Sequence, residues 1–438
     1  MSGPEAFRIA AEIFESPSGS IAKAPHHTLL VGWIKGGGGK SEKIDQAVIS
    51  LFRAPNSYTG EDVIEISCHG SPFVLKEVLQ LCVQKGARLA GPGEFTQRAY
   101  LNGKMDLLQA EAVAELIRVK SQKGREIAAQ HLSGNLSGRI GKIRRKLVDF
   151  LAHLEANLDF VEEDIPDLSR KDMEKGLQDC LKELDELLGT SLRGNFIREG
   201  IRIALIGRAN VGKSSLFNAL LAQERAIVTD VPGTTRDILE ERLQWNGMSV
   251  VLSDTAGIEK TWNEVDKLGV DRARKTQALA SIIFFVLDGS QPLSQEDVNL
   301  AKDFQGQEVV VVLNKMDKGL QIGRPDVKKS LGFDLCLETS AKNGSGLSEL
   351  KSNVVRLFKK FVPEVEDGFV LVNLRHLAHL EHAVDRLKNA LTALKENKSE
   401  EAVAIDAREA LEEIGAITGE NVSPDILTSI FNRFCIGK

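Results

Sequence analysis

Cysteine is scarce in this chain, with five residues in 438. The five are scattered and show no spacing typical of metal ligands: Cys68, Cys82, Cys180, Cys336 and Cys435. Their odd number and wide separation argue against a disulfide framework. The pattern therefore fits a reducing compartment.

Long apolar runs and a basic excess are also missing. No stretch approaches the roughly 20 apolar residues that span a bilayer, so we expect no membrane-spanning segment. Met1 to Glu15 lack the basic region and apolar core of a signal peptide, which predicts a cytoplasmic location. A net charge of −6 disfavours a polyelectrolyte-style nucleic-acid binder, so any RNA contact is expected to be local or shared with a partner.

The chain is long enough for several domains, because single cores stop growing well below 438 residues. Between residues 28 and 68, short β-branched runs alternate with turn residues, and 72–85 carries a helical pattern, which predicts an α+β region. The glycine-rich segment 36–40 superficially resembles a phosphate loop. A hairpin tip is the favoured interpretation, since no buried strand precedes it and no apolar helix follows.

Helical periodicity dominates after about residue 107 and resumes at Leu374. One apolar face repeats every three or four residues through Leu147, Leu151, Leu154 and Leu158. Because the two helical stretches flank an α/β segment, we predict one discontinuous helical domain with that segment inserted. A run of basic residues, favoured as a solvated helix face over an RNA contact, comprises Arg139, Lys142, Arg144, Arg145 and Lys146.

A nucleotide site is indicated where the apolar run 201–206 leads into Gly207–Ser214 and then into a helical segment. Strand, glycine loop and helix in this order are typical of a P-loop. Backbone amides of the loop would hold the β-phosphate and Lys213 the β and γ oxygens, while the Ser214 hydroxyl would bind Mg²⁺.

Three later motifs follow at the order and spacing of G proteins. Asp254-Thr255-Ala256-Gly257 ends an apolar strand and would lie beside Mg²⁺ and the γ-phosphate. Asp317 of the motif 314–317 can accept both hydrogen bonds from the guanine N1 and N2 edge, which selects guanine. The residues predicted to bind GTP are Asn210, Val211, Gly212, Lys213, Ser214, Ser215, Thr229, Asp230, Val231, Pro232, Gly233, Thr234, Thr235, Asp254, Thr255, Ala256, Gly257, Asn314, Lys315, Asp317, Ser340, Ala341 and Lys342.

The switch region predicts an unusual hydrolytic centre. Thr235 would join Mg²⁺ only when the γ-phosphate is bound. Ile258 stands where Ras-like enzymes place the glutamine that orients water, so another group must serve. Asn210 offers a side-chain oxygen, and backbone carbonyls of Thr229, Val231 and Thr234 could complete a shell around a monovalent cation. The alternative, that Asn210 only braces the loop, stays open.

The segment Ala226–Asp237 and the final Cys435-Ile436-Gly437-Lys438 resemble the tRNA-modification GTPase family MnmE, also called TrmE, of the TrmE-Era-EngA-YihA-Septin-like superfamily. The resemblance spans nearly the whole chain, because further family motifs match at 57–62, 68–70, 91–96, 101–107 and 431–434.

The resemblance implies a multidomain α+β and α/β fold. Its parts would be an N-terminal α+β domain for folate binding and dimerisation (1–106), a discontinuous all-helical domain (107–197 and 363–438) and an inserted P-loop G domain (198–362). It further implies a homodimer with potassium on Asn210, Thr229, Val231 and Thr234.

The implied activity is potassium-dependent GTP hydrolysis coupled to tRNA modification. With a flavin-dependent partner of the MnmG (GidA) type, the protein would add a carboxymethylaminomethyl group to C5 of the wobble uridine of certain tRNAs. The one-carbon unit would come from a tetrahydrofolate derivative. By motif match, Glu65, Lys104 and Lys438 would contact the folate and Cys435 would lie at the modification centre.

The chain departs from the family pattern at two places. It starts at a point that a glycine-rich segment and a strand ending in arginine normally precede, so we expect one folate contact and one strand to be missing. Asp266 stands where the family has a water-positioning glutamate, and we predict that Asp266 orients water.

Other interpretations remain open at this stage. Cys435 could be a buried core thiol. His376, His379 and His382 follow one another three apart, which is not the i, i+4 spacing of helical zinc pairs. Cys68 and His69 are adjacent and should point to opposite faces of a strand, which favours structural roles. The alternative functions are a regulatory or ribosome-assembly GTPase switch and a folate-dependent aminomethyl transferase with a vestigial GTPase.

Overall fold

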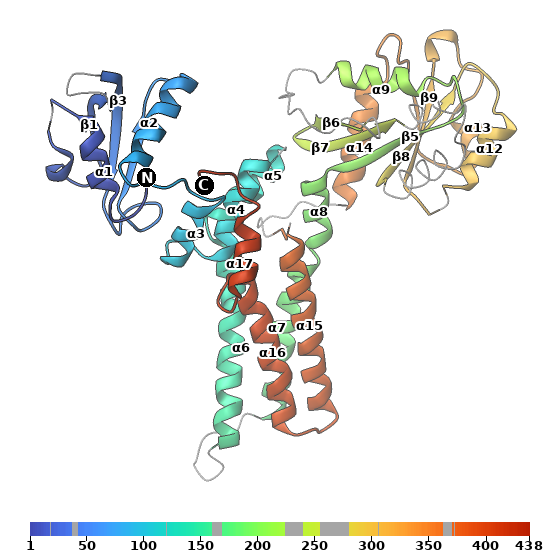
Figure 1. Cartoon of the computed structure of the whole chain (residues 1–438). Helices are drawn as coiled ribbons and strands as arrows, with labels where there is room; N and C mark the ends of the chain where they lie inside the picture. The colour runs from blue at the N-terminus through green and yellow to red at the C-terminus, as the bar shows by residue number, and fades with distance from the viewer. Residues whose placement is uncertain are drawn as a thin grey trace, which may run out of the picture. The chain divides into compact units, whose positions relative to one another are not determined.

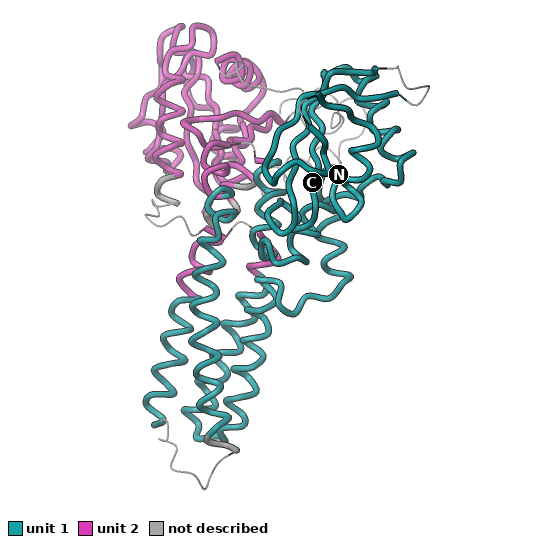
Figure 2. Tube along the Cα trace, turned by 90° about the vertical axis from the view of Figure 1, so that its left-hand side faces the viewer, with its two compact units in different colours: residues 1–118, 128–184, 378–438 teal, residues 119–127, 185–377 magenta. Residues whose placement is uncertain are grey.

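A computed structural model describes residues 1–17, 19–36, 43–119, 121–159, 169–223, 240–254, 280–304, 306–361, 370–371 and 373–438. The chain divides into two compact units (Figure 2). Unit 1 consists of 1–118, 128–184 and 378–438, and unit 2 of 119–127 and 185–377. Each unit is therefore assembled from segments that lie far apart in the sequence.

Unit 1 begins with a four-stranded antiparallel sheet in the order β1-β2-β3-β4 (Figure 1). Alternating burial along β3 places Ala47, Ile49 and Leu51 on one face, and helices α1 and α2 pack their apolar residues against that face. The predicted strands and the helix near 72–85 are confirmed. The bounds are α1 Ala6–Ile13, β1 Phe14–Glu15, η1 Ile21–Lys23, β2 Thr28–Lys35, β3 Lys43–Phe52, β4 Val63–Ser67 and α2 Pro72–Gln84.

Helices make up the rest of unit 1, and the long helices α6, α7, α15 and α16 run side by side (Figure 1). Leu147, Leu151 and Leu154 are buried on α6, which confirms the predicted apolar face. The bounds are α3 Glu94–Leu101, α4 Leu107–Arg118, α5 Gln122–Leu132, α6 Asn135–Asp159, α7 Arg170–Leu188, α15 Leu374–Lys395, α16 Glu400–Thr418 and α17 Pro424–Phe431. Parts of α5, α7 and α15 belong to unit 2.

The basic run on α6 is partly neutralised by neighbouring helices. Arg144 forms an ion pair with Glu420, and Lys146 forms one with Glu183. Lys142 is exposed. These pairs favour the solvated helix face over an RNA contact.

Unit 2 is built on a six-stranded sheet in the order β10-β9-β8-β5-β7-β6, parallel except for β6. Apolar residues of α9 and α14 join the core on one face, and residues of α12 and α13 join the core on the other. This is the predicted α/β G domain fold. The bounds are α8 Ser191–Glu199, β5 Ile201–Ile206, α9 Lys213–Ala222, β6 Glu240–Trp245, β7 Met248–Asp254, β8 Ile282–Asp288, α12 Gln295–Lys302, β9 Val309–Asn314, η2 Met316–Lys318, α13 Arg324–Leu331, β10 Cys336–Glu338 and α14 Leu347–Phe361.

Among the described helices of both units, none is long and apolar enough to cross a membrane.

Candidate nucleotide-binding site

The predicted nucleotide residues that the structure describes gather at the carboxyl edge of the parallel strands. The loop 207–212 follows β5, Asp254 ends β7 and Asn314 ends β9. In parallel sheets this edge is where ligands bind, because strand ends and helix N-termini converge there. Motifs that are far apart in the sequence therefore meet at one site.

The phosphate loop lies tightly against the sheet edge. A Cβ on Gly207 would come within 2.2 Å of the Val286 carbonyl oxygen, and one on Gly212 within 2.3 Å of Asn314 Nδ2. Gly212 and Asn210 have φ of +99° and +62°, in the left-handed region. Helix α9 begins at Lys213 with no side-chain cap, so its first amides suit an anion such as phosphate.

Lys213 is held along the same loop. Its side chain is buried, and Nζ donates to the carbonyl oxygens of Gly207 and of Arg208, the latter at 3.1 Å. Ser214, the predicted Mg²⁺ ligand, is half-buried in the first turn of α9, and Asp254 is buried. An ammonium and a hydroxyl at the start of α9 and a carboxylate at the end of β7, the strand paired with β5, are the groups that a Mg²⁺-bound nucleoside triphosphate requires.

The base-recognition loops are fastened to the phosphate loop. Asn314 Nδ2 donates to the Val211 carbonyl oxygen at 3.1 Å. Asn314 Oδ1 accepts from the N–H of Ala341, one of the residues predicted to bind GTP, at 3.0 Å. Ser340 Oγ donates to Asp317 Oδ1 at 2.6 Å, and this hydrogen bond lowers the pKa of Asp317. The Asp317 carboxylate is the acceptor that the sequence analysis assigns to guanine.

Asp288 is a site residue that the sequence analysis missed. Lys315 Nζ donates to Asp288 Oδ2 at 2.7 Å and to the Asn210 carbonyl oxygen at 2.6 Å. Ser290 donates its N–H and Oγ to Asp288 Oδ1 at 3.1 and 2.6 Å. Burial alone would raise the pKa of Asp288, but the bonds from Lys315 and Ser290 outweigh it and lower that pKa. The available signal was an aspartate at the end of a buried strand.

The switch residues and the proposed water-positioning aspartate lie outside the described residues. They are Thr229, Asp230, Val231, Pro232, Gly233, Thr234, Thr235, Thr255, Ala256, Gly257, Ile258 and Asp266.

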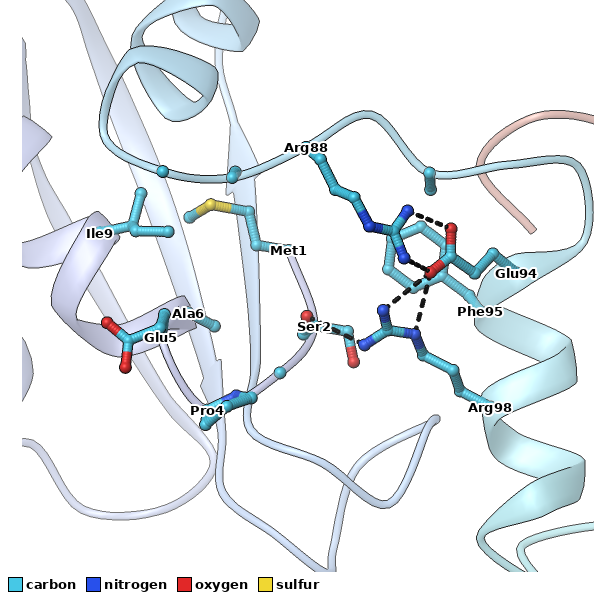
Figure 3. A pocket seen from close by; sticks show the side chains of 14 residues that line it. Met1, Ser2, Pro4, Glu5, Ala6, Ile9, Arg88, Glu94, Phe95 and Arg98 are labelled. Atoms are coloured by element: carbon cyan, nitrogen blue, oxygen red, sulfur yellow. Dashed lines mark hydrogen bonds and ion pairs between the residues drawn. The ribbon is translucent and has the colours of Figure 1, made fainter.

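The three predicted folate residues lie on separate elements of unit 1. Glu65 is exposed on β4, and Lys104 follows α3 with Nζ donating to the Pro55 carbonyl oxygen at 3.1 Å. The Lys438 carbonyl oxygen accepts from the Phe95 N–H at 3.1 Å. A cavity of about 230 Å³ in this unit is lined by other residues, among them Glu94 and the two arginines that bind it, Arg88 and Arg98 (Figure 3).

The candidate cysteines and histidines differ in their exposure to solvent and in their contacts. Cys435 is exposed, so it is not a buried core thiol. Cys68 packs against the sheet core, and burial raises its pKa. His69 is exposed instead, with Nδ1 2.7 Å from Asp45 Oδ1. Both residues follow β4 and do not lie on it, so their different exposure does not come from the strand geometry that we predicted. His379 Nδ1 lies 2.6 Å from Glu413 Oε2, which makes this histidine part of a contact between α15 and α16.

Comparison with known proteins supports this organisation. Residues 107–435 match the family model described as the MnmE helical domain, and residues 1–104 match the GTP-binding protein TrmE N-terminus. The tRNA modification GTPase MnmE of Aquifex aeolicus is 44% identical over 91% of this chain and 88% of its own length. Those of Thermoanaerobacter pseudethanolicus and Symbiobacterium thermophilum are 39% and 40% identical, each over 100% of this chain and 95% of its own length.

Among solved structures, the G domain of the T. maritima FeoB iron transporter is 27% identical. The match covers 36% of this chain and 97% of that chain, with a TM-score of 0.28. The two family models together account for both units, and the curated relatives match almost the full length. The chain belongs to the MnmE family of tRNA modification GTPases.

Proposed function

We propose that this chain is a GTP hydrolase that works in tRNA modification. The observation that carries the hydrolase part is the fastening of the phosphate loop to the Asn314–Asp317 loop, through Asn314 to Val211 and Lys315 to Asn210. These two hydrogen bonds hold the proposed phosphate donors and the proposed guanine acceptor together at the carboxyl edge of the parallel strands. The tRNA part rests on the relatives, which are named tRNA modification GTPases.

The residues divide the work as their chemistry dictates. Amides of the loop and of the first turn of α9 would bind the phosphates, and Lys213 would neutralise their charge. Ser214 and Thr235 would hold Mg²⁺, which supplies charge neutralisation at the β and γ oxygens. Asp317 would accept from guanine, and the segment 340–342 would close over the base.

Potassium is the proposed activating ion, because the motif has isoleucine at 258 where a water-orienting glutamine would stand. Asn210, Thr229, Val231 and Thr234 would hold the ion, and Asp266 would orient water. The left-handed Asn210, whose carbonyl is bound by Lys315, supports a loop that is fixed in place when the ion arrives. Replacing KCl with NaCl at equal ionic strength should then lower the hydrolysis rate.

The N-terminal region 1–106 is proposed to bind a tetrahydrofolate derivative and to form a homodimer. Glu65, Lys104 and Lys438 would contact the folate. The sheet leaves Leu29 and Val31 67% and 50% exposed on its outer face, and α2 leaves Phe73 74% exposed. Apolar surface of this kind supports a protein interface, and a second copy is the proposed occupant.

The modification itself is proposed as addition of a carboxymethylaminomethyl group to C5 of the wobble uridine, together with a flavoprotein of the MnmG type. The folate derivative would supply the one-carbon unit, and Cys435 would act at the modification centre. The work on tRNA implies a cytoplasmic location. The helical domain (107–197 and 363–438) would connect this centre to the G domain (198–362).

The test is mass analysis of tRNA nucleosides from cells that lack the gene, complemented with variants of the chain. Wild type should restore the modified wobble uridine, whereas Lys213→Ala should not, because the phosphate-binding ammonium is lost. Lys328→Ala is a matched control, since this lysine is 72% exposed and pairs with Asp334 away from the site.

Unchanged wobble uridines in the deletion strain would overturn the tRNA assignment and leave a switch GTPase as the function. Full complementation by Lys213→Ala would overturn the requirement for GTP hydrolysis.

A further inference from the structure

The segment Cys435–Lys438, here called the tail, lies against the segment Pro92–Phe95, here called the docking loop. The Gly93 N–H donates to the Cys435 carbonyl oxygen at 3.3 Å, and Pro92 forms an antiparallel bridge with Ile436. The Phe95 N–H donates to the Lys438 carbonyl oxygen at 3.1 Å. Backbone contacts thus run along the whole tail.

These contacts also complete the beginning of helix α3. The helix starts at Glu94, its N-cap is Gly93, and no side chain caps it. The first amides of a helix have no partner within the helix and need one from outside. Because the tail supplies that partner through Lys438, the tail and α3 stabilise each other.

A carboxylate clamp holds the docking loop in shape. Glu94 Oε2 accepts from the Gly91 N–H and from Arg88 Nη1, both at 2.8 Å, and Oε1 accepts from Arg98 Nη2 at 2.7 Å (Figure 3). Arg98 Nη1 also donates to Glu61 Oε2 at 2.8 Å. The loop is therefore tied to two arginines and, through one of them, to the N-terminal sheet region.

Gly93 is where the docking loop comes closest to Phe431 and Phe434, the two buried residues that precede the tail and are here called its anchor. Its φ is +64°, and a Cβ there would lie 2.9 Å from the Phe431 carbonyl oxygen and 3.0 Å from Phe434 Cβ. Phe431 and Phe434 are buried, with ring centroids 5.2 Å apart. Only glycine permits this backbone and this contact together.

Cys435 follows directly after this anchor. It is exposed, whereas Cys82, Cys180 and Cys336 are buried and Cys68 is half-buried. A thiol that is open to solvent on a backbone held at both sides is suited to meeting another molecule in a defined position.

We propose that the docking loop, with Gly93 at its centre, is the positioning element that fixes the Cys435 thiol for the modification reaction. This inference rests on the proposed role of Cys435. Gly93 and Glu94 are positioning residues, since they act through the tail. Release of the tail should therefore impair the modification step more than the binding of tRNA.

The experiment compares Gly93→Ala with Gly91→Ala in the full chain. Gly91 lies just outside the loop, and a Cβ there meets only Glu94 Oε2 at 3.9 Å. In Gly93→Ala, amide hydrogen exchange in 92–96 and 433–438 should accelerate about tenfold, from left-handed strain alone. In a reconstituted reaction with the flavoprotein, kcat for tRNA modification should fall about tenfold or more, with KM for tRNA and GTP hydrolysis unchanged.

Gly91→Ala should match wild type in all of these measurements. If Gly93→Ala does not fold, Glu94→Gln replaces it and should show the same pattern with a smaller change. Wild-type exchange in the substituted chain, or a released tail with wild-type modification, overturns the proposal. Cys435→Ser distinguishes failure of the positioning proposal from failure of the proposed role of Cys435. If this variant modifies tRNA normally, the proposed role of Cys435 is wrong, whatever the exchange data show.

Discussion

Asp288→Asn tests whether the ion pair at the end of β8 shapes the nucleotide site. Asp288 is 6% exposed and Lys315 is 25% exposed, and Nζ lies 2.7 Å from Oδ2. A hydrogen bond between charged groups is worth about 1.5–3 kcal/mol. Partial solvent access to Lys315 reduces this to about 1–2 kcal/mol, because water can replace the lost partner. Asparagine keeps the size of the side chain and an oxygen for Ser290, so the core around β8 should stay packed.

The loss should be felt in nucleotide affinity. Without Asp288, Lys315 is free to leave the Asn210 carbonyl. Part of the free energy of nucleotide binding is then needed to order the phosphate loop. A cost of about 1–2 kcal/mol corresponds to about 5- to 30-fold weaker binding of GDP and GTP. Titration with a fluorescent guanine nucleotide measures this directly.

Asp334→Asn is the matched control for this variant. It breaks a lysine–aspartate pair of the same 2.7 Å length, but with side chains 72% and 80% exposed, so affinity should not change. Affinity of Asp288→Asn within twofold of wild type, or an equal loss in Asp334→Asn, would refute the reasoning.

Two further predictions concern stability. Several hydrogen bonds, the one from Arg88 foremost, lower the pKa of Glu94 from 4.5 to about 2, so the stabilisation is present above pH 4.5 and is lost as pH falls towards 2. Because Arg88 is 67% exposed, we expect about 1–2 kcal/mol, seen as a steeper acid loss in urea unfolding of wild type than of Glu94→Gln; parallel curves would contradict this. Gly346→Ala should destabilise unit 2 by about 3 kcal/mol, since φ is +76° and a Cβ would lie 2.0 Å from the Glu338 carbonyl oxygen. Gly306→Ala, with φ +81° and open space, should cost about 1 kcal/mol in the same assay, and equal losses would show that the contact is irrelevant.

The nucleotide site could be predicted from sequence because its main part is local. A buried strand, the loop 207–212 and α9 follow one another directly, so the sequence motif and the structural element consist of the same contiguous residues. The strands β2 to β4 could also be predicted from sequence, because their short runs of β-branched and other apolar residues are bounded by turn residues.

Contacts between distant segments could not be predicted in this way. Lys315 reaches the Asn210 carbonyl across 105 positions, and a backbone acceptor leaves no signature in residue type. The docking loop and the tail were both noticed as family motifs, but their contact is made by main-chain groups of Gly93 and Phe95. Main-chain groups are nearly the same in every residue, so which of them pair depends on the tertiary fold and not on residue type.

The hydrogen bonds of the nucleotide site are of two kinds. Asn314 to Val211 and Lys315 to Asn210 join one protein loop to another and involve no group assigned to the phosphates. In the second kind, the Lys213 ammonium, predicted to bind phosphate, and the N–H of Ala341, in the segment predicted to close over the base, donate to protein oxygens. GTP must offer phosphate and guanine oxygens in exchange for these, so part of each new hydrogen bond only replaces an existing one. Affinity therefore depends on the first kind, which keeps the loops in register while the second kind changes partners.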